Sequence, residues 1–232
     1  MSMIDDATNR RESYMAEEET TEAAMLVFWS WVEKYGIPHS VYLDRLAVYV
    51  SDREPTLEEQ LEGIEPKTAF GRALEKLGVK IITAYSPQAK GRVERCHGVY
   101  QDRLVKEFRL EEAASINEAN AILMSGFVDE MNEKFAIDPR SDHDYHRPVP
   151  KNLDLRNVFC WETPRTVGND WVVRHENRYF QILRGNRPLP RAREHVLLRE
   201  WIDHSIHIFY KEKEMKVEEK TSAETVTQQR AS

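Results

Sequence analysis

The chain has 232 residues, of which 41% are hydrophobic, so it can bury a core in one or two domains. Its 33 basic and 40 acidic side chains give a net charge of -7, which excludes a uniformly basic, histone-like DNA coat. No stretch reaches the roughly 18 apolar residues of a membrane span, and residues 1–11 lack the apolar segment of a signal peptide. Two cysteines, Cys96 and Cys160, make no disulfide framework. We therefore expect a cytoplasmic protein with reduced thiols and no membrane partner.

The charge is unevenly distributed along the chain. Residues 85–110 carry six basic and three acidic side chains, and residues 151–210 carry ten and seven, so two basic islands interrupt an acidic chain. All basic residues of the second island except Lys151 are arginines, whose planar forks suit phosphate groups. Ordinary solvated arginines on a β surface explain the second island equally well, and charge alone leaves both interpretations open.

Hydrophobic periodicity and turn residues predict alternating strands and helices in the first 137 residues. Thr20 and Thr21 can cap the first helix, and Gly36 followed by Pro38 ends it, because glycine stops a helix and proline cannot continue one. The expected order is a hairpin over 3–16, a helix over 20–36, a strand over 39–44, a mobile acidic loop over 52–66, a helix over 68–77, a strand over 79–84, a loop over 85–92, and helices over 93–110 and 112–135. This order indicates an α/β layer architecture.

The pattern changes after residue 137. Residues 138–155 are rich in proline and aspartate and predict a linker between two domains. Residues 156–210 contain short alternating runs, at 171–173, 178–182, 195–198 and 205–210, which favour a small all-β barrel. The charged and then polar residues 211–232 predict a disordered tail.

An acidic residue at the end of a strand and another at the start of a distant helix form the candidate catalytic pair. Asp44 closes the strand over 39–44, and Glu94 opens the helix after the loop over 85–92. Paired carboxylates are the hard oxygen ligands that Mg²⁺ prefers, with positions left for water and phosphate. Lys90, Arg92 and Arg95 surround Glu94 in sequence and suit a phosphate backbone. Such acids are also common without any function, since the helix dipole favours glutamate at that position.

Three sequence motifs resemble the integrase core of DDE transposases. They are Tyr42-Leu-Asp-Arg45, Ser86-Pro-Gln-Ala-Lys-Gly-Arg-Val-Glu-Arg95 and Gln101-Asp-Arg-Leu104. The similarity is to bacterial insertion-sequence enzymes, in particular the ISNCY group, and more distantly to retroviral integrases. It covers residues 3–150, and residues 169–210 resemble the small β-barrel that follows such cores.

The resemblance implies an RNase H-like fold in which three acids bind two Mg²⁺ (or Mn²⁺) ions that activate water or a 3′-hydroxyl against a DNA phosphodiester. Asp44 matches the second acid and Glu94 the third. His97 and Gln101 match positions that face DNA, and the flexible active-site loop supplies Lys90 and Arg92. The implied partners are element-end DNA, target DNA and further copies of the chain in one complex.

The first catalytic aspartate of that family is not matched in this chain. Asp5 and Asp6 fall on the second strand and its turn, so neither receives a catalytic role. The resemblance thus predicts an N-terminally truncated transposase that is marginal in stability and metal binding. An inactive remnant that only binds DNA or interferes with the full-length enzyme is the alternative, and an RNase H-like nuclease without a transposition role is a weaker one.

Other polar clusters offer weaker candidates. Arg184, Arg187, Arg191 and Arg193 flank a turn at Gly185-Asn186 and form the best non-catalytic candidate for a DNA contact; a solvated loop explains them equally well. A polar loop explains the cluster of Asp142, His143, Asp144 and His146 better than a metal site does. Cys96 lies on the apolar face of its expected helix, where packing is more common than nucleophilic chemistry.

Overall fold

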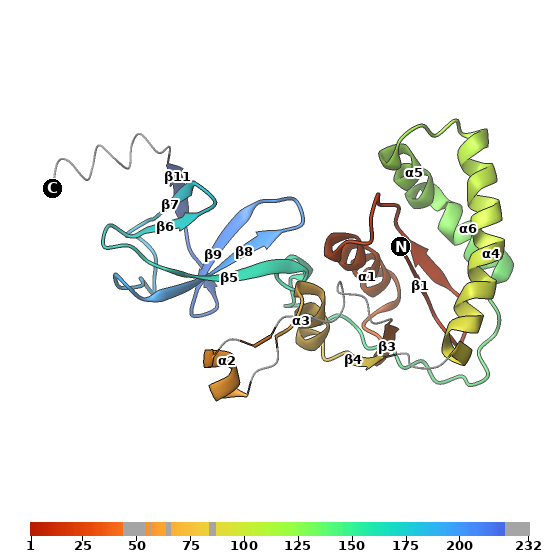
Figure 1. Ribbon diagram of the computed structural model, residues 1–232, viewed down its shortest axis with the longest axis horizontal. Helices are drawn as coiled ribbons and strands as arrows, with labels where there is room; N and C mark the ends of the chain where they lie inside the picture. The colour runs from red at the N-terminus through yellow and green to blue at the C-terminus, as the bar shows by residue number, and fades with distance from the viewer. Residues whose placement is uncertain (44–53, 56, 64–65, 84–86, 221–232) are drawn as a thin grey trace. The chain divides into compact units, whose positions relative to one another are not determined.

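The computed structural model describes residues 1–43, 54–55, 57–63, 66–83 and 87–220; of residues 58, 59, 62, 83, 87–97 and 99 it describes the backbone alone. The described chain divides into two compact units, one running from Met1 to Phe159 and the other starting at Cys160 (Figure 1). Together the helices and strands make a mixed α/β protein.

The first unit contains two small sheets and a set of helices. Its elements in chain order are β1 (Ser2–Ile4), β2 (Arg11–Ser13), α1 (Thr21–Tyr35), β3 (Ser40–Leu43), α2 (Leu57–Glu62), α3 (Ala69–Lys76), β4 (Lys80–Thr83), α4 (Pro87–Leu110), α5 (Ile116–Ile122), the π-helical turn η1 (Leu123–Phe127), α6 (Val128–Phe135) and the 3-10 turn η2 (Leu155–Asn157).

The predicted hairpin and first helix are confirmed. β1 and β2 pair antiparallel, with Met3 opposite Glu12. The Thr20 hydroxyl accepts the Ala23 amide at 3.1 Å and so caps α1, which ends at Gly36 with a φ of 96°. The buried side of α1 carries Met25, Phe28, Trp31 and Val32 and provides the centre of the core of this unit.

β3 and β4 form a two-stranded parallel sheet, close to the strands predicted over 39–44 and 79–84. Ser40 pairs with Lys80 and Leu43 with Thr83. Between them α3 is capped by Thr68, whose hydroxyl accepts the Gly71 amide at 3.0 Å. The loop predicted over 52–66 is wrong in one part, because α2 makes Leu57–Glu62 helical.

The helices after β4 differ in their limits from the prediction. The loop predicted over 85–92 is wrong from residue 87 on, since α4 begins at Pro87; proline at the first helical position needs no amide partner and favours the start of a helix. The single helix predicted over 112–135 is interrupted: a Ser115–Glu118 capping box starts α5, and Gly126, with a φ of 123°, breaks the helical backbone before α6.

The segment predicted to be a linker packs on the first unit. Ile37 and Arg147 form an antiparallel bridge, with both backbone hydrogen bonds at 2.8 Å. The Trp31 indole donates to Nε2 of His146 at 3.1 Å, and the Trp29 ring stacks on Phe159 with centroids 5.6 Å apart. Residues 138–159 therefore belong to the first unit by their contacts, which proline and aspartate content does not reveal.

The second unit consists of two antiparallel sheets. One has the strand order β10-β9-β8-β5 and the other the order β11-β7-β6. Their bounds are β5 (Cys160–Thr166), β6 (Val172–His175), β7 (Arg178–Ile182), β8 (His195–Trp201), β9 (Ile206–Tyr210), β10 (Lys213–Glu214) and β11 (Val217–Lys220).

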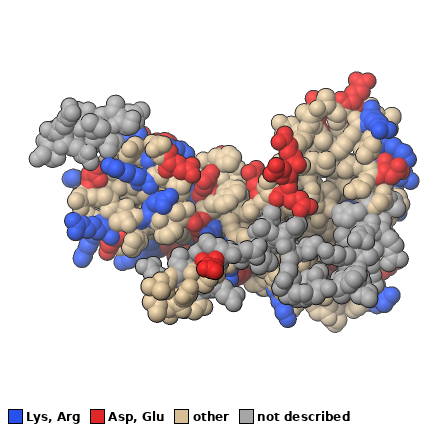
Figure 2. Space-filling model, viewed as in Figure 1, with Lys and Arg blue, Asp and Glu red and all other residues tan. Residues whose placement is uncertain are grey.

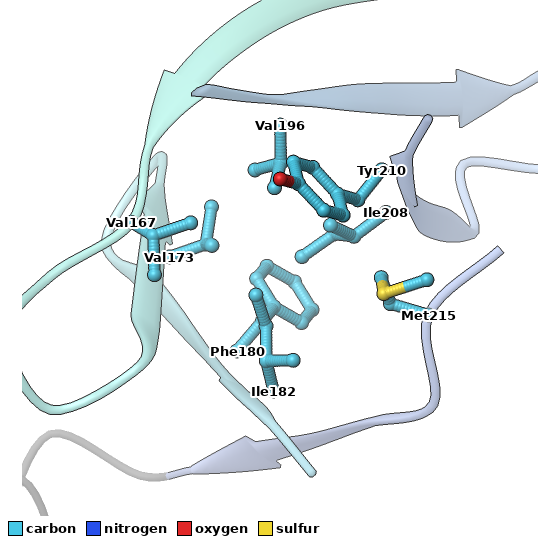
Figure 3. Packing of buried hydrophobic residues seen from close by; sticks show 8 residues of the cluster. All are labelled: Val167, Val173, Phe180, Ile182, Val196, Ile208, Tyr210 and Met215. Carbon is cyan, nitrogen blue, oxygen red and sulfur yellow. The ribbon is translucent and has the colours of Figure 1, made fainter. Parts of the chain in front are cut away.

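An apolar core lies between these strands (Figure 3). Val173, Phe180, Ile182, Val196 and Ile208 are all at most 3% exposed. The disordered tail predicted from residue 211 is wrong for 213–220: Met215 is buried in this core, and β11 pairs with β7. The Arg178–Glu219 ion pair, at 2.7 Å, crosses the same two strands.

Candidate functional site

The parallel register of β3 and β4 determines where the candidate catalytic pair is attached to the fold. β3 and β4 run parallel, and Leu43 lies opposite Thr83 in the last pair of the described residues. Asp44 follows Leu43 directly and lies outside the described residues. Glu94 belongs to α4, which begins four residues after Thr83, but its side chain is outside the described part of the structure. The chain thus continues from the paired residues Leu43 and Thr83 to both candidate residues.

The other candidate residues of this region lie on the same helix. Lys90, Arg92, Arg95 and His97 fall on α4, and their side chains are not among those described. Gln101 is exposed on α4. Seven residues separate positions 94 and 101, which is close to two helical turns. Both positions therefore share one face of α4, the face on which Gln101 is open to solvent.

The second half of α4 is fixed by a buried apolar cluster. Tyr100 and Leu104 pack with Leu123, Val128 and Met131 from the helices that follow. These helices lie beside α4 in Figure 1. The cluster fixes α4 at Tyr100 and Leu104, which follow positions 94 and 97 along the helix.

Tyr100 also contacts the β1–β2 hairpin. The Arg11 guanidinium lies 4.5 Å from the centre of the Tyr100 ring, and Arg11 is only 5% exposed. A cation over an aromatic face in a buried place is stabilised by the ring quadrupole. Burial raises the pKa of the Tyr100 phenol above its ordinary value. Hairpin and helix are therefore joined by a specific contact at Tyr100, six positions after Glu94 along α4.

No group of three or more metal-ligating side chains occurs in the part of the chain that the structure describes. The weak alternative of a metal site around His143 and His146 gains no support, because the contacts of His146 are structural. Its Nε2 accepts the Trp31 indole proton, so Nδ1 carries the imidazole proton and donates to Asp144 at 2.7 Å. The His146 backbone amide also donates to Asp144, at 2.9 Å, and this hydrogen bond, followed by the one from the ring, lowers the pKa of the Asp144 carboxyl.

The four candidate arginines of the second unit lie in the loop between β7 and β8, residues 183–194. Arg184, Arg187, Arg191 and Arg193 are all exposed. The Arg184 guanidinium lies 5.5 Å from the centre of the Trp171 ring, and Nη1 of Arg187 donates to the carbonyl of Arg184 at 2.9 Å. In the space-filling view, acidic side chains lie between the basic ones on the visible face of this unit (Figure 2). Within the loop itself, residues 183–194, these four arginines accompany one acidic residue, Glu194.

This arginine loop has a rigid base. Asn186 is 6% exposed; its Nδ2 donates to the carbonyls of Leu183 and Lys216, and its Oδ1 accepts the Lys216 amide at 2.8 Å. At the other end Glu194 accepts the Tyr210 hydroxyl and the Arg191 amide, each at 2.7 Å. The Tyr210 hydrogen bond, and then that of Arg191, lowers the pKa of the Glu194 carboxyl.

Sequence reasoning missed the residues that hold the candidate sites in place. It interpreted Asn186 as a turn residue only, because a polar side chain beside Gly185 indicates a turn and gives no signal that the side chain is buried. It attached no importance to Arg147, whose sequence neighbours are those of a loop. No signal in the sequence distinguishes Arg147 from Arg140, which lies in the same proline- and aspartate-rich segment.

Two curated proteins are similar to this chain in sequence. A protein of Sinorhizobium fredii named as a transposase, y4bF, is 35% identical over 181 residues, which are 77% of this chain and 38% of that protein. The transposase for insertion sequence IS1202 of Streptococcus pneumoniae is 29% identical over 180 residues, 76% of this chain and 37% of its own length. The chain thus spans under two fifths of the length of each relative.

No protein-family model matches the chain. Among solved structures, a chain in the cryoEM structure of the simian T-cell lymphotropic virus intasome in complex with PP2A regulatory subunit B56 gamma is 13% identical and covers 90% of this chain and 70% of its own. Its TM-score of 0.34 is too low to support a fold assignment.

Both sequence relatives are named as transposases. They confirm the resemblance of this chain to insertion-sequence transposases, the family with which the motif around Glu94 was compared. Within the described residues, no helix combines the length and the apolar character that a membrane crossing requires.

Proposed function

We propose that this chain acts in DNA transposition as part of an enzyme that cleaves DNA and joins strands at element ends. Its sequence similarity to transposases supports the general function. The observation that supports the chemical part is the parallel pairing of Leu43 with Thr83, because the chain continues from these two residues to Asp44 and to α4. We also propose that the chain folds as an RNase H-like core followed by a small β-barrel.

The two residues that we propose as metal ligands fit a divalent metal ion. Asp44 and Glu94 offer carboxylate oxygens, the ligand type of Mg²⁺ and Mn²⁺. Bound between them, the metal would supply Lewis-acid stabilisation of charge on a phosphodiester. Lys90, Arg92 and Arg95 of the chain would neutralise neighbouring phosphates, while His97 and Gln101 would contact the DNA from the same helix.

We propose element-end DNA, target DNA and further copies of the chain as partners. Cleaving and joining two ends requires both to be held in one complex, which favours an oligomer. The arginine loop of the second unit, with four exposed arginines, is suited to bind the DNA backbone without a metal.

The second candidate is an inactive relative that binds DNA or interferes with a full-length transposase. The arginine loop is the observation that favours it, because its charge and rigid base need no metal and no catalytic acid. This candidate keeps DNA binding and omits cleavage.

Replacement of the candidate acid separates the two functions. We expect Glu94→Ala to abolish Mg²⁺-dependent nicking of supercoiled plasmid and to leave DNA affinity unchanged. Glu111→Ala, an exposed acid just beyond the same helix, is the matched control and should nick at the unmodified rate. If the unmodified chain binds DNA and never nicks it with Mg²⁺ or Mn²⁺, the binding-only candidate replaces the catalytic one.

A further inference from the structure

Arg147 joins the two segments that lead into β3 and β4. Its amide and carbonyl both bond to Ile37 at 2.8 Å, three residues before β3. Its side chain reaches the other strand: Nη2 donates to the carbonyls of Leu77 at 2.7 Å and Gly78 at 3.2 Å, just before β4. One residue therefore holds the N-terminal ends of both strands.

The surroundings of Arg147 are shaped for this contact. A Cβ atom on Gly36 would lie 2.7 Å from the Arg147 carbonyl oxygen, closer than real Cβ atoms approach. A Cβ atom on Gly78 would lie 3.5 Å from the guanidinium. The neighbouring His146 accepts the indole proton of Trp31, which is 2% exposed in α1. Two glycines and a buried indole thus fix the path of the chain at Arg147.

In the described part of the chain β3 and β4 pair over four residues each, and the segments before both strands contact Arg147. Their pairing begins where the Lys80 amide donates to the His39 carbonyl at 3.0 Å. A slip of one residue would move Leu43 by about 3.3 Å relative to Thr83 and turn its side chain to the opposite face. The register of the Leu43–Thr83 pair is therefore sensitive to the contacts that hold the N-terminal ends of the two strands.

We infer that Arg147 is a positioning residue, which sets the register of β3 against β4 and thereby the placement of Asp44 relative to α4. The inference rests on the proposed function for the metal-binding role of Asp44 and Glu94. Arg147 acts from the opposite end of the strands and touches no reacting group. Its effect is transmitted through the paired residues 40–43 and 80–83.

The test measures Mn²⁺ affinity and residue-level amide exchange in the full chain. We expect Arg147→Ala to weaken Mn²⁺ binding about tenfold, as loss of a supporting group commonly does, and to accelerate exchange of the Lys80 amide. Exchange in α1 and in residues 160–220 should keep its rate. Low-millimolar guanidinium should restore part of the affinity, and Arg147→Lys, which keeps one donor, should be intermediate. Arg140→Ala, an exposed arginine in the same segment, is the control and should change neither quantity.

The outcomes separate this inference from the proposed function. If Glu94→Gln weakens Mn²⁺ binding and Arg147→Ala alters neither binding nor Lys80 exchange, the positioning role is overturned and the proposed metal site stands. Uniform acceleration of exchange in both units by Arg147→Ala also overturns it, because that result indicates global destabilisation. If Glu94→Gln leaves Mn²⁺ binding intact, the proposed metal site fails, and Lys80 exchange alone decides whether Arg147 sets the register.

Discussion

Asn132 on α6 holds the backbone of Arg11 on β2 with both atoms of its side-chain amide. Oδ1 accepts the Arg11 amide and Nδ2 donates to the Arg11 carbonyl, each at 2.9 Å. Both residues are buried, at 8% and 5% exposure. The asparagine therefore replaces a strand neighbour for Arg11, whose guanidinium lies over Tyr100 of α4.

Removing this amide should strongly destabilise the first unit. Asn132→Ala leaves a buried amide and a buried carbonyl without their partner, which costs about 1–3 kcal/mol for each group. We expect the free energy of unfolding to fall by about 3 kcal/mol, measured by urea denaturation. Asn117→Ala, at an exposed position of α5, should change it by less than about 0.5 kcal/mol. Equal stabilities for the two variants would contradict the role assigned to Asn132.

Local sequence signals predicted part of this architecture. Thr20 and Gly36 bound the first helix because capping and helix termination depend on neighbouring residues. Pro87 was interpreted as a loop residue, although the same residue type suits the first position of a helix. The limits of elements were therefore less predictable than their existence.

Contacts between distant residues were not predictable from the sequence. Asn132 and Arg11 are 121 residues apart, Arg147 and Leu77 are 70 apart, and Asn186 and Lys216 are 30 apart. None of these pairs has a local pattern, because each depends on the folded path of the chain. Asp44 and Glu94 were predicted as a catalytic pair from their strand and helix positions and from a family resemblance. The distance between their carboxylates stays a prediction.

Alanine at Gly36 should destabilise the first unit through two effects. Its φ of 96° is unfavourable for any residue with a Cβ, and that atom would also meet the Arg147 carbonyl oxygen. We expect a loss of about 2–4 kcal/mol in the free energy of unfolding, from backbone strain and overpacking together. Thermal or urea unfolding measures this loss.

Gly63 provides the control for Gly36. It also has a positive φ, 67°, but a Cβ there would meet no atom of the described residues within 4 Å. Gly63→Ala should therefore show the strain alone, about 1 kcal/mol. If both substitutions cost the same, the close approach of Gly36 to Arg147 contributes nothing.

Asp144 should make stability depend on acid. Hydrogen bonds from the backbone and ring of His146 lower its pKa from the ordinary value of 3.8, so folding favours the ionised carboxylate. Its contribution is fully present above about pH 4 and is lost as the pH falls through the lowered pKa of the folded state. The stability difference between the unmodified chain and Asp144→Asn should therefore be constant at pH 5–7 and shrink below pH 4.

The exposure of Asp144 limits the size of that effect, because solvent screens the interaction. Asp142→Asn, two residues earlier in the same exposed segment, is the control. Unfolding curves between pH 2.5 and 7 compare the three proteins. A difference for Asp144→Asn that grows as the pH falls would show that the sign of the linkage is wrong.

The arginine loop should determine how DNA affinity depends on salt. Each guanidinium that neutralises a phosphate releases a counterion, so the slope of log K against log salt changes by about 0.9 per contact. Replacing Arg184, Arg187, Arg191 and Arg193 by alanine should therefore reduce the magnitude of the slope by roughly 3 to 4. Fluorescence anisotropy with a labelled duplex at several salt concentrations measures it.

Two further variants distinguish this loop from general charge. Arg174→Ala removes an exposed arginine from β6 in the same unit and should leave the slope nearly unchanged. Asn186→Ala keeps every charge but removes the hydrogen bonds to Leu183 and Lys216, so it should weaken binding with little change in slope. A loss of slope in Arg174→Ala equal to that of a single loop arginine would show that DNA responds to the charge of the whole unit, and the loop would then have no special role.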